Sequence, residues 1–258
     1  MKRSKRILAA LMGVLMLSST LSGCTLLQFD DPAEIKQQEQ ELEKQESVAR
    51  PDIKTLLDGE HLVIDEHLTD GTGKEIAHYQ AHFPYFKAED NAALQNINSF
   101  YEAEFSHLES DKDRFFKLAT EKPSEVLRTS SFDFTLLNAH PEHIAILRSY
   151  ESVDSLGESG KLYTCDLFSS ATGLRLKFGD VFSGNKAKAV ELLRKDLTEW
   201  CEAGGHDTAW LEGMSDDLLC ENFTISTNTL YIGFDRGTLP DGSTLIEMDL
   251  APYTTFME

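Results

Sequence analysis

The chain has 258 residues, of which 41% are hydrophobic, and it carries 44 acidic against 24 basic side chains, a formal charge of −20. Binding to nucleic acid or to anionic surfaces needs Lys and Arg that neutralise phosphate, so this charge argues against those partners. The same charge would attract cationic ligands, or it simply keeps an exposed protein soluble. The apolar content and the 15 Phe residues indicate a folded body rather than a disordered chain.

The first 24 residues have the pattern of a bacterial lipoprotein signal. A basic start precedes the apolar run Ile7–Leu17, and Leu21-Ser22-Gly23-Cys24 follows. We therefore expect residues 1–23 to be removed and Cys24 to receive a lipid that holds the protein outside the cell, on the cell membrane. An ordinary signal peptide with a coincidental cysteine and an uncleaved anchor are the alternatives. No later segment approaches the roughly 20 apolar residues of a transmembrane helix.

Residues 24–52 are expected to form a polar tether. The stretch 34–46 is rich in Glu and Gln but has only Ile35 and Leu42 as apolar residues. Because a coiled coil needs several heptads, a solvated and partly helical spacer fits better. The folded body is expected from Ile53 onward, as a subdomain of residues 53–158 and a second of residues 159–258.

The body alternates between the two-residue period of strands and the longer period of helices. A helix is predicted from residue 89, because Leu94, Ile97, Tyr101 and Phe105 form one stripe, and a charged loop is expected over 111–123. Further helices are predicted over 185–204 and, more weakly, 215–220. Strand patterns cover residues 61–68, 74–86, 129–137, 143–153, 162–168, 174–178, 223–227, 229–234 and 244–250. This order predicts an α+β fold, an antiparallel sheet with amphipathic helices packed on one face.

Three cysteines remain if lipid occupies Cys24. Cys201 and Cys220 flank one helical connection and could close a short loop as a disulfide outside the cell. Cys165 lies in an apolar strand pattern and is expected to be a buried thiol. The alternative is that all three are free thiols, and the sequence does not choose between the two.

The histidines do not form a recognisable metal site. His78 and His82 lie four residues apart on a predicted strand, which separates them by roughly 13 Å, too far for two ligands of one zinc ion. No nucleophile motif, dinucleotide loop or phosphate loop is present, so neither an enzyme nor a cofactor is expected. The main alternative is a wall hydrolase with an unrecognised site, for which Cys201 near His206 is the nearest approach to a dyad.

Two aromatic residues are candidates for ligand binding. Trp210 lies in a Gly-rich, acidic stretch and is the aromatic residue most expected to be exposed. Tyr85 belongs to the Phe83-Pro84-Tyr85-Phe86 segment. An exposed aromatic ring in an acidic surface suits a cationic protein better than a neutral glycan.

Four segments carry a resemblance to a known domain pair. They are Phe83–Phe86 with the helix at Ile97-Asn98, Tyr163–Asp166 with Thr172-Gly173, Leu176–Phe182, and Leu230–Asp235. Residues 53–158 resemble a DUF4163 domain and residues 159–258 a DUF3298 domain. The pair is similar to the extracellular region of RsiV-type anti-sigma factors, and its first half is similar to the domain that precedes the catalytic part of PdaC-type peptidoglycan deacetylases.

The resemblance implies a binding or sensory module of the bacterial envelope, with a lysozyme-like cationic protein or peptidoglycan as its ligand. The chain departs from the family pattern after Asp235, where Arg236–Gly242 replaces the usual Pro-Tyr loop and an Ala-Pro-Tyr sequence occurs only at Ala251–Tyr253. Arg236 is therefore the third candidate for ligand binding. A purely structural lipoprotein is the remaining alternative.

Overall fold

The computed structural model describes residues 53–138 and 141–257. The chain divides into two units, Met1–Pro51 and Asp52–Glu258, and the second contains all of the described residues. The predicted leader, Cys24 and the tether lie outside the described residues. Within the described part, no helix combines the length and apolar character that crossing a bilayer requires.

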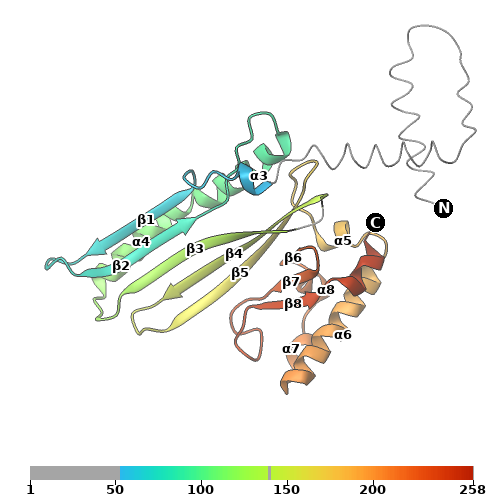
Figure 1. Cartoon of the computed structure of the whole chain (residues 1–258). Coiled ribbons are helices and arrows are strands. Elements are labelled where there is room, and N and C mark those ends of the chain that lie inside the picture. The colour runs from blue at the N-terminus through green and yellow to red at the C-terminus, as the bar shows by residue number, and fades with distance from the viewer. Residues whose placement is uncertain (1–52, 139–140, 258) are drawn as a thin grey trace, which may run out of the picture. The chain divides into compact units, whose positions relative to one another are not determined.

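A five-stranded sheet forms the larger part of the body (Figure 1). Its spatial order follows the chain and comprises β1 (Val63–Thr69), β2 (Glu75–His82), β3 (Arg128–Leu137), β4 (His143–Val153) and β5 (Ser159–Ser169). Three of the four neighbouring pairs are antiparallel, as predicted. β2 and β3 instead run parallel, with Ala77 opposite Arg128. The reason is the connection between them, because helices carry the chain back along the sheet before β3 begins.

That connection consists of two helices, α3 (Ala92–Phe105) and α4 (Leu108–Glu121). A short 3-10 helix, η1 (Ile53–Leu56), precedes β1 and is not part of the connection. Asn91 caps α3, since its side chain accepts from the backbone N–H groups of Ala93 and Leu94. The prediction of a charged loop over 111–123 is wrong, because most of this stretch belongs to α4. Only Leu108 and Ala119 of α4 are buried, so the sequence of this stretch shows only a weak apolar stripe from which a helix could be predicted.

The α+β class is confirmed by a first core between α3, α4 and one face of the sheet. It contains, among others, Leu94, Ile97 and Tyr101 from α3, Tyr79 and Ala81 from β2, and Ile144, Ile146 and Phe168 from β4 and β5. An asparagine supports the same contact. Asn98 donates to the carbonyl of Phe86 at 2.7 Å and accepts from its N–H at 2.8 Å, so α3 is held to the segment after β2.

The C-terminal part of the body is built on α6 (Lys186–Gly204), which ends at Gly205 with φ of 68°, a left-handed conformation that glycine favours. Figure 1 shows α6 beside an antiparallel meander of β6 (Phe223–Ile225), β7 (Thr229–Gly233) and β8 (Leu245–Asp249). The short elements are α5 (Phe178–Val181), α7 (Ala209–Glu212), α8 (Asp216–Leu219) and η2 (Ala251–Phe256). The helix and meander agree with the sequence prediction.

The two cores lie on opposite faces of the larger sheet. Ala145 and Leu167 belong to the C-terminal core, whereas Ile144, Ile146 and Phe168 belong to the first core. Neighbouring residues of a strand point to opposite faces, so β4 and β5 are covered on both sides near this end. The predicted subdomain boundary at 158/159 falls in the turn between these two paired strands, and the two predicted subdomains therefore share one sheet.

Candidate functional site

The face of the larger sheet that points away from α3 and α4 is the candidate site, and we call its polar part the open face. Strand register places a row of half-buried or exposed side chains there: Asp65, His67, His78, Gln80, His82, Thr129, Ser131, Asp133, Ser149, Glu151, Lys161 and Tyr163. The alternate residues of β2, Ala77, Tyr79 and Ala81, are buried in or beside the first core. One set of strands thus gives an apolar inner face and a polar outer one.

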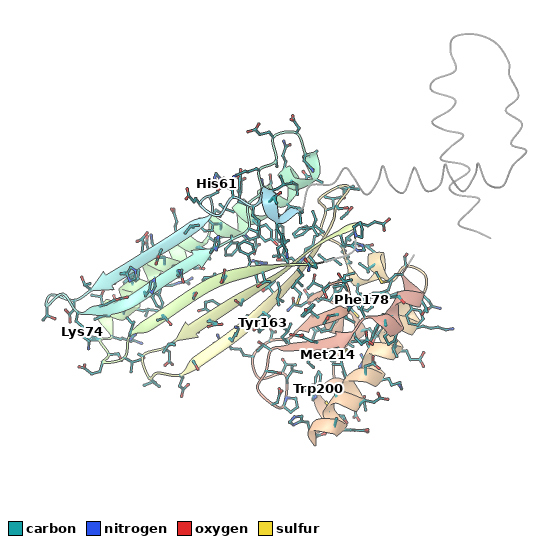
Figure 2. All side chains as sticks on the ribbon, in the orientation of Figure 1. His61, Lys74, Tyr163, Phe178, Trp200 and Met214 are labelled. Atoms are coloured by element: carbon teal, nitrogen blue, oxygen red, sulfur yellow. The ribbon has the colours of Figure 1, made fainter. Side chains whose placement is uncertain are left out.

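The charges of the open face are unevenly distributed. Asp65, Asp133 and Glu151 are carboxylates, whereas Lys161 is the only Lys or Arg among the residues named above. Lys161 forms an ion pair with Glu151 across the β4–β5 pair and lies 5.0 Å from the ring centroid of Tyr163. Tyr163, labelled in Figure 2, is therefore an aromatic side chain flanked by charge. Such a face can bind a cationic surface, and its one aromatic ring offers a stacking contact.

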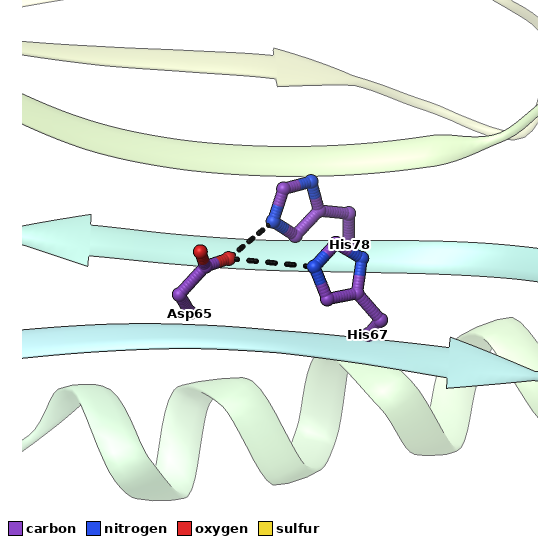
Figure 3. Close-up of side chains that lie close together, drawn as sticks. All are labelled: Asp65, His67 and His78. Atoms are coloured by element: carbon purple, nitrogen blue, oxygen red, sulfur yellow. Dashed lines mark hydrogen bonds and ion pairs between the residues drawn. The ribbon is translucent and has the colours of Figure 1, made fainter.

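A histidine pair lies at the hairpin end of the open face (Figure 3). His67 of β1 stands directly opposite His78 of β2, and their rings stack with centroids 4.0 Å apart. The carboxylate oxygen Oδ1 of Asp65 lies 2.7 Å from Nε2 of His78 and 3.6 Å from Nε2 of His67. The three donor atoms lie within 4.8 Å of one another. We call Asp65, His67 and His78 the histidine cluster.

A fourth residue, Glu75, orients the imidazole of His67 through a hydrogen bond on the side of the ring away from Asp65. Nδ1 of His67 lies 2.8 Å from Oε1 of Glu75, and a carboxylate can only accept, so Nδ1 carries the proton of this hydrogen bond. The hydrogen bond that His67 donates to Glu75 raises the pKa of His67 above its ordinary value of 6.5. Asp70 fixes the hairpin turn by accepting from the N–H groups of Thr72 and Lys74. That turn sets the register that brings His67 opposite His78.

A second group of charges is buried beneath α3. Asp166 of β5 has no exposed side-chain surface, and its Oδ2 accepts from Nε of Arg148 at 2.7 Å and from the hydroxyl of Tyr101 at 3.1 Å. Oδ1 lies 3.2 Å from Nη2 of Arg175. Burial raises the pKa of Tyr101 well above its usual value, so its hydroxyl remains a donor. Glu104 adds a further carboxylate 3.5 Å from Arg148.

This network joins the parts of the body, with Asp166 buried at its centre and Arg175 and Glu104 at its exposed margin. Tyr101 comes from α3, Arg148 from β4 and Asp166 from β5, while the hydroxyl of Thr224 in β6 donates to the Asp166 carbonyl at 3.0 Å. Burial alone would lower the pKa of Arg148, but Asp166, Tyr101 and Glu104 together outweigh it and the pKa is raised. We infer a structural role for the network, since it ties α3 to β4 and β5, although within the described residues Oδ1 of Asp166 has only its ion-pair contact with Arg175 and no hydrogen bond.

A surface pocket of about 610 Å³ lies between the β1–β2 turn and the end of α4. Its ionisable lining residues already have partners. Nζ of Lys74, labelled in Figure 2, lies 3.0 Å from Oε2 of Glu125, and Asp70 holds the turn described above. The pocket therefore offers less to a ligand than the open face does.

The structure separates the three predicted ligand-binding residues and puts none of them on the open face. Tyr85 is half-buried and stacks on His61 at 3.8 Å. Trp210 is also half-buried and packs edge-on against Phe234, which contradicts the expectation that it is exposed. The reason is that Trp210 lies on α7, where its ring covers the margin of the C-terminal core.

Arg236 makes contacts within the chain. Its guanidinium lies 5.7 Å from the ring centroid of Tyr150, and Nη2 donates to the Ser152 hydroxyl at 3.2 Å. Tyr150 and Ser152 alternate with Ser149 and Glu151 along β4, so they point away from the open face. Arg236 thus attaches the β7–β8 loop to the larger sheet.

The three cysteines of the body are free and buried, so the Cys201–Cys220 disulfide is not formed. Cys201 occupies the buried stripe of α6, and Cys220 packs in the C-terminal core at the end of α8. Burial raises the pKa of Cys220 to about 11 and also raises that of Cys165. The alternative of three free thiols is the correct one for this structure.

The histidine cluster is the arrangement that sequence reasoning missed. Spacing along one strand pairs His78 with His82, whereas the partner of His78 in the structure, His67, lies across the hairpin. The signal was present as the alternation Asp65-Glu66-His67 followed by the turn at Asp70-Gly71. A register assumed for that hairpin would have placed the two histidines together.

No protein-family model and no curated protein matches the sequence. The fold is nevertheless that of DUF3298 family structures, which supports the DUF3298 part of the resemblance. A solved DUF3298 family protein of Bacteroides fragilis aligns with a TM-score of 0.53 and 14% identity, over 78% of this chain and 94% of that one. A second, from Pseudomonas aeruginosa, aligns with a TM-score of 0.54, 14% identity and the same coverage. Identity this low shows the fold alone.

Proposed function

We propose that the chain is a lipid-anchored module of the bacterial cell envelope that binds an extracellular cationic protein on its open face. The observation that carries the proposal is the polarity of this face. Its carboxylates, Asp65, Asp133 and Glu151, stand on a sheet whose other face is apolar and packed against α3 and α4. A rigid sheet that presents fixed carboxylates is suited to recognition of a basic surface.

The overall charge supports the same ligand class. With 44 acidic against 24 basic residues, of which four basic ones lie in the predicted leader, the mature protein would attract a basic protein by long-range electrostatics. Such attraction raises the association rate and weakens as salt screens it. A lysozyme-like protein is the partner that the resemblance to RsiV-type proteins implies.

Peptidoglycan is the second candidate ligand, and Tyr163 is the observation that favours it. Its ring lies on the open face, and sugar rings commonly stack on exposed aromatic side chains. Stacking on an aromatic ring depends little on salt, whereas attraction between opposite charges depends on it strongly. Salt dependence therefore separates the two candidates.

The test uses residues 25–258, which contain the whole described body and both of its cores. Binding is measured to a basic lysozyme and to insoluble peptidoglycan, at low and at moderate salt. We expect saturable binding to lysozyme that weakens with salt. Absence of binding to both ligands overturns the proposal, and turnover of labelled peptidoglycan would favour the wall-hydrolase alternative instead.

A pair of double variants tests the location. Asp133→Asn with Glu151→Gln removes two charges from the open face, and Glu191→Gln with Glu199→Gln removes two from exposed positions of α6. We expect the first to reduce the association rate on the order of fivefold and the second to change it little. An equal loss in both variants would show that the open face is not where the ligand binds.

A further inference from the structure

We propose that the histidine cluster is a binding site for a divalent transition-metal ion of the zinc type, held by Nε2 of His67, Nε2 of His78 and Oδ1 of Asp65. These atoms converge on one point at the end of the β1–β2 hairpin, as Figure 3 shows. Two imidazoles and one carboxylate form a ligand set that zinc accepts in proteins, with water in the remaining position. The site is separate from the positions Asp133 and Glu151 on which the proposed function is tested.

The spacing of the donor atoms fits such an ion. Ligands bound at about 2.0–2.2 Å to a tetrahedral zinc lie roughly 3.3 Å from one another. The contact between Asp65 and His67 is 3.6 Å, and all three atoms lie within 4.8 Å. Side-chain rotation is enough to bring them onto one ion, because all three residues are partly exposed at the surface of the sheet.

The orientation of His67 also fits a metal site. Glu75 accepts the hydrogen bond of Nδ1, so Nε2 is the ring nitrogen left for a metal, and it lies 3.6 Å from Oδ1 of Asp65. A carboxylate behind a ligating histidine is the usual outer partner that fixes the ring in metal sites.

Binding of the ion shifts a proton between the two nitrogens of His78. In the metal-free protein Nε2 of His78 donates to Oδ1 of Asp65 over 2.7 Å. When the metal binds, Nε2 gives up this proton and Nδ1 of the same ring takes one up from solvent, so the metal-bound ring keeps one N–H, and both Nε2 and Oδ1 turn their lone pairs to the ion. The two strands carry all the ligands, so the ion would also join β1, the edge strand, to β2.

The experiment measures binding of Zn²⁺ and of Co²⁺ to residues 25–258, purified without a histidine tag and treated with a chelator first. Calorimetry gives the stoichiometry, and the visible absorption of bound Co²⁺ reports on its coordination. We expect one ion per chain and, for Zn²⁺, an increase in the melting temperature. The variants His67→Gln, His78→Gln and Asp65→Asn should each weaken binding about tenfold or more, and Glu75→Gln should weaken it through loss of orientation.

His82→Gln is the matched control. His82 lies on the same strand and face as His78, roughly 13 Å away, and interacts with Asp133 instead of the cluster. The His82→Gln variant should bind the metal ion with the same affinity as the unchanged protein. The proposal is overturned if the unchanged protein shows no saturable binding, or if His67→Gln and His78→Gln bind as tightly as His82→Gln does. Circular dichroism in the presence of chelator verifies that each variant is folded.

Discussion

The buried network around Asp166 allows a quantitative prediction for Asp166→Asn. The side chain of Asp166 has no solvent exposure and that of Arg148 has 14%, so the substitution removes the buried counter-charge of a nearly buried guanidinium and leaves it only the half-exposed Glu104, 3.5 Å away. Removal of one partner from a buried ion pair costs about 3–5 kcal/mol of unfolding free energy. For a body of this size, that cost corresponds to a decrease in melting temperature of roughly 6–20 °C.

The assay is urea unfolding of residues 25–258, followed by far-ultraviolet circular dichroism and by tryptophan fluorescence. Asp133→Asn is the control, because its carboxylate is 67% exposed and its loss should change stability by no more than about 0.5 kcal/mol. The double variant Asp166→Leu with Arg148→Met removes both charges and should recover much of the stability lost in Asp166→Asn. A loss below about 1 kcal/mol for Asp166→Asn would refute the assigned role.

Three further predictions concern backbone, hydrogen bonds and thiols. Gly173→Ala should destabilise the protein by about 2 kcal/mol or more, because φ is +69° and the added Cβ would meet the carbonyl oxygen of Ala93; thermal melting measures this. Asn98→Ala should cost about 1–3 kcal/mol in urea unfolding, since both backbone groups of Phe86 lose their partner. Cys220 should not react with a thiol reagent at neutral pH in the folded protein, because it is buried with a pKa of about 11, whereas unfolding in urea should expose it.

The sequence was sufficient to predict the strands of both sheets, the longest helix and the α+β class, because their residues alternate or repeat with a clear period. The strand predicted over 174–178 is wrong, because this stretch holds only an isolated bridge at Arg175 and Phe178 begins α5. It was not sufficient for α4, whose surface is mostly charged and whose buried residues are few. The parallel pairing of β2 with β3 could not be read from either strand alone. The parallel pairing follows from the helical connection between the two strands. This connection was not predicted in full, because residues 111–123 were expected to be a loop.

The interactions at the candidate sites depend on register and on tertiary contact. His67 and His78 are eleven residues apart, and only the hairpin turn brings them together. In the sequence Asp166 is visible only as the end of the Tyr163–Asp166 segment, because the fold alone brings its partners Tyr101 of α3 and Arg148 of β4 to it. Trp210 and Arg236 were chosen for their chemistry, but packing against Phe234 and Tyr150 occupies them.

The unequal covering of the sheet explains why the open face is the favourable place for binding. Near Ala145 and Leu167 both faces of the sheet are packed, one by α3 and α4 and the other by the C-terminal core. Toward β1 the inner face is still packed, so the strands are held in place, while the outer face carries ionisable side chains at positions of defined register. Because the strands beneath the exposed polar groups are already held in place, less conformational entropy is lost when a ligand binds. The same support would serve both the proposed protein ligand at Asp133 and Glu151 and the proposed metal ion at His67 and His78, and the separate variants distinguish the two proposals.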